Sequence, residues 1–203
     1  MTRHIAGIVV AAGGSTRMGE PKQLIEVHGR PMLQWVIDAA AASRLGRVVI
    51  VVAPDSGELR AAVTGGRATF VINPDPATGT MSSFRTGVAA AGPAAGYVKL
   101  LADQPEVTPA DIDALIDGWD PAAHSGAVAS YRGEDGHPLL VGGDALRSVI
   151  DEDGDRLLWQ LLMDGEPARV EIDRLRPIDV NTPADLAALR ERLAQRPPAP
   201  PTA

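Results

Sequence analysis

The stretch IAGIVVAAGGSTRMGEPK, residues 5–22, decides the fold and contains the first candidate site. Residues 5–12 are continuously apolar and rich in β-branched side chains. Such a run is typical of a strand that is buried on both faces in a parallel sheet. Three glycines and two cations follow in residues 13–22. A buried strand that ends in this kind of loop predicts an α/β fold with an anion-binding turn.

Apolar strands and amphipathic helices alternate in the first part of the chain. We expect strands at 5–12, 47–52, 68–73 and 97–101, and helices at 32–42, 56–63, 81–91 and 109–119. This alternation predicts one doubly wound, mostly parallel α/β sheet of Rossmann-like type, with helices on both faces. In such sheets ligands bind beyond the carboxyl ends of the strands, where the glycine loop and the segment after residue 101 both fall.

The second part of the chain is less regular. We expect strands at 127–131, 136–142, 168–172 and 178–180, and helices at 157–163 and 183–192. Thr108 and Thr182 each stand before a proline, at positions suited to cap the helices that follow. No linker interrupts residues 1–195, so we expect them to form one domain, followed by a disordered proline-rich tail at 196–203.

The composition excludes several classes of protein. A chain of 203 residues with 45% hydrophobic and 22% charged residues suits a globular domain. A net charge of -7 and only 3% aromatic residues argue against a nucleic-acid partner. The absence of cysteine excludes disulfides, zinc thiolate sites and thiol catalysis. No apolar run reaches the roughly 18 residues of a membrane helix, so we expect no membrane partner and a cytoplasmic location.

The glycine loop fails two common phosphate-binding patterns. Glu20 stands where the Walker loop needs lysine, and Ser15 stands where the dinucleotide fingerprint needs its second glycine. The glycines still allow backbone N–H groups to approach a phosphate. Arg17 can form paired hydrogen bonds with phosphate oxygens, and Lys22 adds a compact charge. An ordinary strand-to-helix turn is the alternative, but this density of glycine and cations favours phosphate binding.

The segment AAGGSTRMGEPKQL resembles the signature of the glycosyltransferase-A-like nucleotidyltransferases. Further resembling segments follow in the same order: GTMSSFR at 79–85, LADQP at 101–105, GHPLL at 136–140 and DVNTP at 179–183. Together they resemble most closely the molybdenum-cofactor cytidylyltransferase-like proteins. The resemblance implies an enzyme of glycosyltransferase-A-like fold that transfers a nucleotide from CTP to a phosphorylated acceptor such as molybdopterin. It also implies a molybdenum hydroxylase as a partner that receives the product.

Two alternatives remain open at this point. A guanylyltransferase of the same family would use GTP in place of CTP, and other phosphorylated acceptors use similar loops. A protein of another class would bind the nucleotide or cofactor without turnover. Asn181, where many relatives carry aspartate, favours that second alternative.

Asp103 is the first candidate metal ligand. It ends a predicted buried strand, where a carboxylate is costly unless it meets a cation. Mg²⁺ prefers one or two protein oxygens together with phosphates and water. The resemblance implies the same role for Asp103 and places Asn181 at the second ligand position, although the nearby Asp179 could serve instead. A helix cap or a salt bridge is the structural alternative for Asp103.

The resemblance assigns the remaining site residues. The expected catalytic residues are Arg17, Lys22 and Asp103. The expected nucleotide-binding residues are Ala11, Ala12, Gly13, Gly14, Ser15, Arg17, Lys22, Asn73, Gly79, Ser82, Ser83, Arg85 and Asp103. The expected acceptor-binding residues are His137 and Pro138, on a loop before a strand, and Gly154. Ser82 could instead cap the helix that begins near residue 81.

Overall fold

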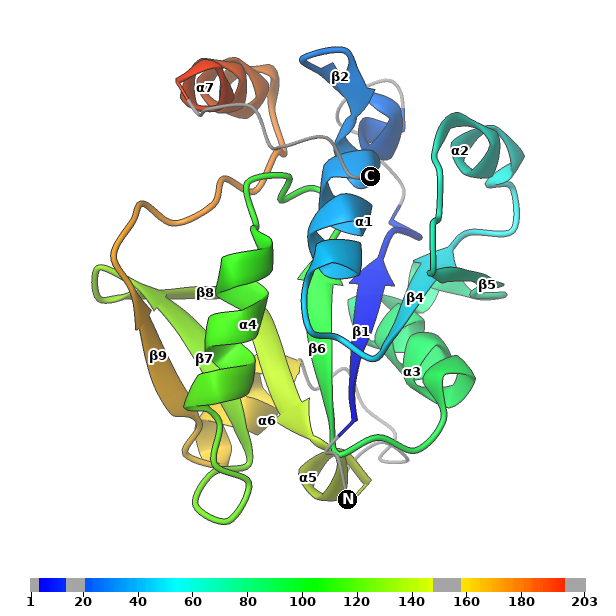
Figure 1. Cartoon of the computed structure of the whole chain (residues 1–203). Helices are drawn as coiled ribbons and strands as arrows, with labels where there is room; N and C mark the ends of the chain where they lie inside the picture. The colour runs from blue at the N-terminus through cyan, green and yellow to red at the C-terminus, as the bar shows by residue number, and fades with distance from the viewer. Residues whose placement is uncertain (1–3, 14–20, 148–157, 196–203) are drawn as a thin grey trace.

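The computed structural model describes residues 4–13, 21–147 and 158–195 of the chain. A seven-stranded sheet with the order β5-β4-β1-β6-β8-β7-β9 forms the centre of the molecule (Figure 1). Its strands are β1 (Ile5–Val10), β4 (Arg47–Val52), β5 (Thr69–Ile72), β6 (Gly96–Leu101), β7 (Gly126–Tyr131), β8 (Glu134–Gly142) and β9 (Ala168–Ile172). Neighbouring strands are parallel except that β8 runs antiparallel to β6 and β7. The prediction of one mostly parallel sheet is confirmed.

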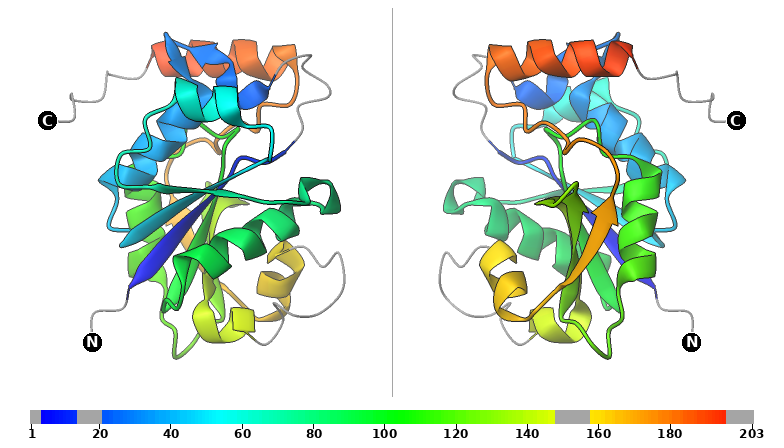
Figure 2. Two further views of the ribbon diagram at one scale, coloured as in Figure 1. Left: turned by 90° about the vertical axis from the view of Figure 1, so that its right-hand side faces the viewer. Right: turned by 90° about the vertical axis from the view of Figure 1, so that its left-hand side faces the viewer.

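Helices cover both faces of this sheet, as predicted (Figure 2). One face packs against α1 (Met32–Ala42), α2 (Gly57–Ala62) and α4 (Pro109–Gly118). The other packs against α3 (Thr80–Ala91), α5 (Gly143–Arg147) and α6 (Leu158–Asp164). None of the helices in the described part of the chain has the length and apolar character needed to cross a bilayer.

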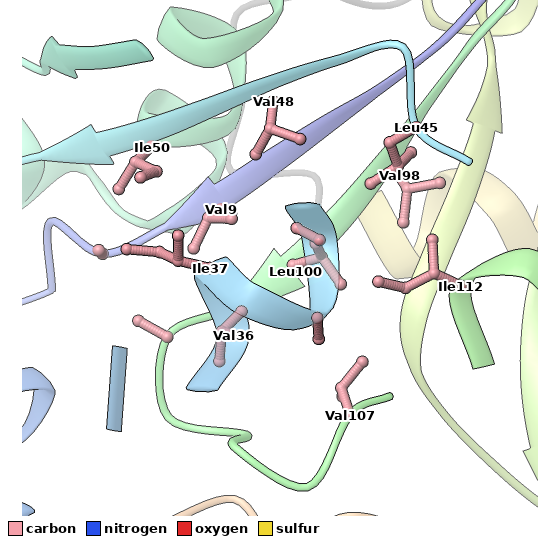
Figure 3. Packing of buried hydrophobic residues seen from close by; sticks show 14 of the residues in the cluster. Val9, Val36, Ile37, Leu45, Val48, Ile50, Val98, Leu100, Val107 and Ile112 are labelled. Carbon is pink, nitrogen blue, oxygen red and sulfur yellow. The ribbon is translucent and has the colours of Figure 1, made fainter. Parts of the chain in front are cut away.

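The first strand is buried on both faces because its alternate side chains enter two different cores. Val9 belongs to the core under α1 and α4, where it packs with Ile37 and Leu100 (Figure 3). Ile8 belongs to the core under α3, which also contains Phe84. A continuous apolar run is therefore required here, in contrast to the alternating pattern of a sheet with one solvated face.

A third, smaller core lies beyond the carboxyl edge of the sheet. It joins the hairpin of β2 (Glu26–Val27) and β3 (Arg30–Pro31) to α7 (Pro183–Ala194), which lie side by side in Figures 1 and 2. Its buried residues are Ile25, Val27, Met32, Val180, Leu189 and Leu193. Because Val180 takes part, this core holds the segment before α7 against residues 25–32.

Two helices begin with the caps that the sequence predicts. Thr108 accepts a hydrogen bond from the backbone N–H of Asp111, whose carboxylate accepts one from the N–H of Thr108. Thr182 and Asp185 make the same reciprocal pair at the start of α7. Such capping boxes satisfy backbone donors that a helix start leaves free.

The predicted strand at 178–180 is wrong. These residues join no sheet, because a side chain and a loop carbonyl take the backbone donors that a strand ladder would use. The carboxylate of Glu106 accepts a hydrogen bond from the N–H of Ile178 at 2.8 Å. The N–H of Val180 makes a single backbone bond, to the carbonyl of Asp103 at 3.2 Å. The predicted tail at 196–203 lies outside the described residues.

Candidate active site

The candidate site lies at the carboxyl edge of the sheet, where β1 and β6 end. Ala11 and Ala12 are buried directly after β1, and the N–H of Ala11 donates to the carbonyl of Val51 at 2.8 Å. Gly13 follows and is exposed. The predicted site residues Gly14, Ser15 and Arg17 lie outside the described residues.

A cation and two oxygen ligands from distant parts of the chain meet at this edge. The Nζ atom of Lys22 donates to Oδ2 of Asp103 at 2.5 Å and to Oδ1 of Asn181 at 3.2 Å. The Lys22 and Asp103 side chains are only 19% and 17% exposed, so water screens this pair weakly. The structure therefore brings together the predicted cation and both predicted metal ligands, and Asp103 forms the salt bridge considered as an alternative.

Asp179 was the other candidate for the second metal ligand, and its contacts differ from those of Asn181. Its Oδ1 accepts a hydrogen bond from Nε2 of Gln104 at 2.5 Å, and its Oδ2 lies 3.7 Å from Nη1 of Arg176. Burial raises the pKa of Asp179, and the nearby Asp103 charge acts in the same direction. Since Asn181, and not Asp179, shares a cation with Asp103, the contacts favour Asn181.

Gln23 has a role that the sequence analysis missed. Its side chain is 4% exposed, and its Nε2 donates to the carbonyl of Ala11 at 3.2 Å and to that of Gly13 at 2.9 Å. The side-chain amide of Gln23, directly after Lys22, thus holds the start of the glycine loop close to Lys22. Its position inside the resembling segment KQL was the signal available in the sequence.

Asn73 organises the loop that leads into α3. It is 1% exposed, and its Nδ2 donates to Oγ of Ser82 at 2.9 Å and to Oγ of Ser83 at 3.0 Å. Its Oδ1 accepts from the N–H of Asp75 at 3.1 Å. Ser82 is not the helix cap, because Gly79 occupies that position with a φ of 106°, where glycine is strongly favoured. Arg85, part-buried on α3, does not line the pocket described next.

These segments enclose a pocket of about 270 Å³. Its lining comes from the end of β1, the segment after the glycine loop, the start of α3 and the end of β6. The lining residues are Val10, Gly13, Lys22, Gln23, Pro76, Gly79, Thr80, Ser83, Leu101, Ala102 and Asp103. The pocket combines an apolar floor with one cation and one carboxylate, which suits a ligand that carries both a ring and charged groups.

His137 and Pro138 lie inside β8, so their predicted place on a loop before the strand is wrong. The register of β7 and β8 shifts between the pairs Val128–Leu139 and Ala129–Gly136. This bulge leaves both residues without a paired residue in the β7 ladder, which is where a strand tolerates a proline. His137 and Pro138 are not among the residues that line the pocket, and Gly154 lies outside the described residues.

His137 is half-buried, and one of its ring nitrogens is held away from solvent. Its Nε2 is fully buried and has no hydrogen-bond partner. Burial lowers the pKa of His137 to about 3, and the positive charges of Lys99 and Arg176 act in the same direction. The imidazole is therefore neutral at neutral pH.

Lys99 is a buried cation that the sequence analysis passed over. It lies in β6 and is 7% exposed. Burial lowers its pKa to about 8, against the opposing effect of the Asp103 charge. Its only signal in the sequence is a charged residue in the middle of an apolar strand, YVKLL.

The fold and the pocket define the class of α/β proteins that bind a ligand at the carboxyl edge of a mostly parallel sheet. Residues 7–170 match the family described as MobA-like NTP transferase domain. The chain belongs to this family of nucleotidyltransferases.

Three similar proteins span nearly the whole chain. Molybdenum cofactor cytidylyltransferase of Escherichia coli (strain K12) is 27% identical over 197 residues, which cover 93% of this chain and 96% of that protein. A probable molybdenum cofactor guanylyltransferase of Natronomonas pharaonis is 30% identical over 208 residues, with 93% and 98% coverage. The structure of Rv0371C from Mycobacterium tuberculosis H37Rv in complex with manganese superposes with a TM-score of 0.79 at 28% identity, with 93% and 98% coverage.

Proposed function

We propose that the protein transfers CMP from CTP to the phosphate of a molybdopterin-type cofactor and releases pyrophosphate. The observation that carries this proposal is the meeting of Lys22, Asp103 and Asn181 beside the pocket. The cytidylyltransferase of Escherichia coli supports the choice of nucleotide and acceptor, since it matches the chain along almost its whole length. The product would pass to a molybdenum hydroxylase.

The reaction is an in-line attack of the acceptor phosphate on the α-phosphorus of the triphosphate. The acceptor phosphate is already a nucleophile, so catalysis rests on positioning and on neutralisation of charge. Lys22 would balance the charge on the α-phosphate and on the departing pyrophosphate, together with Arg17. Gln23 keeps the ends of the glycine loop in place, and Asn73 keeps the start of α3 in place.

The residues present fit Mg²⁺. Asp103 and Asn181 direct two hard oxygen atoms at a single positive group, the ammonium of Lys22. A divalent cation of this size takes one or two protein oxygens and completes its shell with phosphates and water. The described residues contain no group of three or more acidic or histidine side chains that could hold a metal without a substrate. Bound Mg²⁺ would supply charge neutralisation of the phosphates.

Substitution of the cluster tests this proposal. We expect Lys22→Ala and Asp103→Asn to slow pyrophosphate release from CTP, with Mg²⁺ and molybdopterin present, by about 10²–10³-fold, as for loss of one preorganised charge-stabilising group. Arg17→Ala should have a similar effect, whereas Arg60→Ala, which removes an exposed cation on α2, should leave the rate unchanged. Wild-type rates in the Lys22 and Asp103 variants would rule out these roles.

GTP is the second candidate nucleotide, because the guanylyltransferase of Natronomonas pharaonis matches the chain over a similar length. Calorimetric titration with CTP and GTP separates the two, and we expect the tighter binding for CTP. Tight nucleotide binding without pyrophosphate release for any acceptor would instead support a protein that binds the nucleotide without turnover.

A further inference from the structure

The chain contains two lysines, and both lie near Asp103. Lys22 pairs with this carboxylate directly, whereas the side chain of Lys99 makes no hydrogen bond or ion pair within the part of the chain that the structure describes. A charged group that is 7% exposed and has no partner costs stability. A residue that carries this cost without a structural contact is a candidate for contact with a ligand.

The placement of Lys99 connects it to the pocket. Side chains alternate along β6, so Lys99 shares the face of Tyr97 and Leu101, which both pack in the core under α3. Leu101 lines the pocket. Lys99 therefore lies two residues below the pocket floor, a rise of about 7 Å along the strand. The charge of Asp103 acts on the Lys99 ammonium, so this ammonium lies within electrostatic range of the charged end of the pocket.

The strand that carries Lys99, β6, lies between β1 and β8 in the sheet. Lys99 pairs with Leu139, which lies two residues after His137 in the chain. The positive charge of Lys99 acts on the ring of His137, so the two groups lie within electrostatic range. Nε2 of His137 is fully buried and has no partner, and a buried polar atom of this kind is rare in folded proteins. Two polar groups without protein partners thus lie on neighbouring strands.

We propose that Lys99 and His137 form an anion subsite beside the nucleotide pocket and that this subsite binds the phosphate of the acceptor. The inference rests on the proposed function, since it assumes a phosphorylated acceptor. Lys99 supplies an ammonium, and the neutral ring of His137 supplies an N–H donor. Lys22, at the end of the glycine loop, is paired with Asp103 and Lys99 is not, so the two lysines would serve two different phosphates.

A cation for the acceptor phosphate, in addition to those that bind the triphosphate, would favour the reaction. The acceptor phosphate and the triphosphate are both anions, and they must approach within bonding distance. Arg176, the other cation that acts on His137, lies 3.7 Å from Asp179 and 3.9 Å from Glu134. Among the described residues, Lys99 is the cation near the pocket floor whose charge no ion pair balances.

The small number of lysines makes a direct test possible. In the full-length protein labelled with ¹³C-lysine, the two Cε signals can be assigned by comparison with Lys22→Arg. We expect CTP with Mg²⁺ to shift the Lys22 signal, and inorganic phosphate, added to the CTP-bound protein, to shift the Lys99 signal. The ring nitrogen signal of His137 should move with the same phosphate dependence.

The matched variants are Lys99→Met and Arg60→Met. We expect Lys99→Met to weaken phosphate binding at least tenfold, followed at the His137 ring, and to change CTP affinity less than twofold, which also shows that the variant is folded. Arg60→Met should change neither. A Lys99 signal that ignores phosphate, unchanged phosphate affinity in Lys99→Met, or equal losses for CTP and phosphate would each overturn the subsite.

Failure of the proposed function gives a different pattern. If CTP does not bind, the phosphate titration is run without it, and the Lys99 and His137 signals still decide the subsite. If CTP is turned over but phosphate leaves both signals in place, the subsite is wrong and the proposed function stands.

Discussion

At the scale of single residues, the charge of Lys99 lowers the free energy of unfolding of the protein. The residue is 7% exposed in β6, and burial lowers its pKa to about 8 from the ordinary 10.5. The unfolded chain therefore holds this proton more tightly than the folded protein does. The cost is fully present below pH 8, decreases as the pH rises, and vanishes above about 10.5, where both states are neutral.

Lys99→Met should accordingly stabilise the protein. We expect a gain of about 3 kcal/mol at pH 7, the free energy that corresponds to this pKa difference, and a gain close to zero near pH 10.5. Urea unfolding at the two pH values measures both. A loss of stability at pH 7 would mean that the ammonium has a favourable partner in the free protein.

His137 should make stability sensitive to acid. Its pKa is lowered to about 3, so between about pH 6.5 and pH 3 the unfolded chain binds a proton that the folded protein refuses. The stability present above pH 6.5 is lost as the pH falls through this window, by up to about 1.4 kcal/mol per pH unit. We expect His137→Gln to reduce the slope of unfolding free energy between pH 6.5 and pH 4.5. Equal slopes in the two proteins would contradict this.

The site residues that could be predicted were those whose side-chain chemistry and place in the sequence both indicated the same site. Lys22 follows a glycine loop, and Asp103 ends a buried strand, so the sequence alone placed both at the same edge of the sheet. Gln23, Gln104 and Lys99 were missed because their roles depend on contacts between segments that are distant in sequence. The burial of His137 could not be foreseen, because it depends on the bulge that places a proline inside β8.

At the scale of elements, α3 carries Ser83 to the pocket by lying unusually close to the sheet. A β-carbon added at Gly87 would lie 2.3 Å from Cγ2 of Ile8 and 2.9 Å from Cγ2 of Val51. The glycine therefore allows β1 and β4 to contact the helix backbone, and it fixes the height of the helix above the strands.

Gly87→Ala should lower the free energy of unfolding by about 1–3 kcal/mol, because overpacking outweighs the better helix propensity of alanine. The control is Gly57→Ala in α2, where an added β-carbon meets nothing within 4 Å. We expect that change to stabilise by about 0.4–1 kcal/mol through the unfolded chain. Urea unfolding of the two variants measures the difference, and equal effects would show that α3 can move away from the sheet.

The elements were predictable to the extent that local signals specify them. The threonine caps fixed the starts of α4 and α7, and buried apolar runs fixed the parallel strands. The strand expected at 178–180 failed because the competing partner, Glu106, comes from a loop 72 residues earlier. Apolar pattern alone cannot show that a distant carboxylate will take the backbone donor that a strand needs.

At the scale of the whole molecule, the site depends on an ion network that joins α4 to the segment before α7. Asp111 is 3% exposed and binds the guanidinium of Arg174, which also donates to the carbonyl of Glu106 at 3.2 Å. Glu106 in turn holds the N–H of Ile178 and lies 3.4 Å from Arg192 of α7. Through these contacts the network positions the chain that delivers Asn181 to Lys22.

Arg174→Ala should therefore affect both stability and the site. It leaves the Asp111 carboxylate buried without its cation, and loss of one partner of such a pair costs about 3–5 kcal/mol. The control is Arg169→Ala, which removes an exposed cation from a half-buried Asp135 and should cost at most about 1 kcal/mol. Urea unfolding gives the two costs, and Mg²⁺-dependent CTP binding shows whether Asn181 has lost its position. If Arg174→Ala were no more harmful than Arg169→Ala, the segment before α7 would be held by the small core around Val180 and Leu189, and the network would be dispensable.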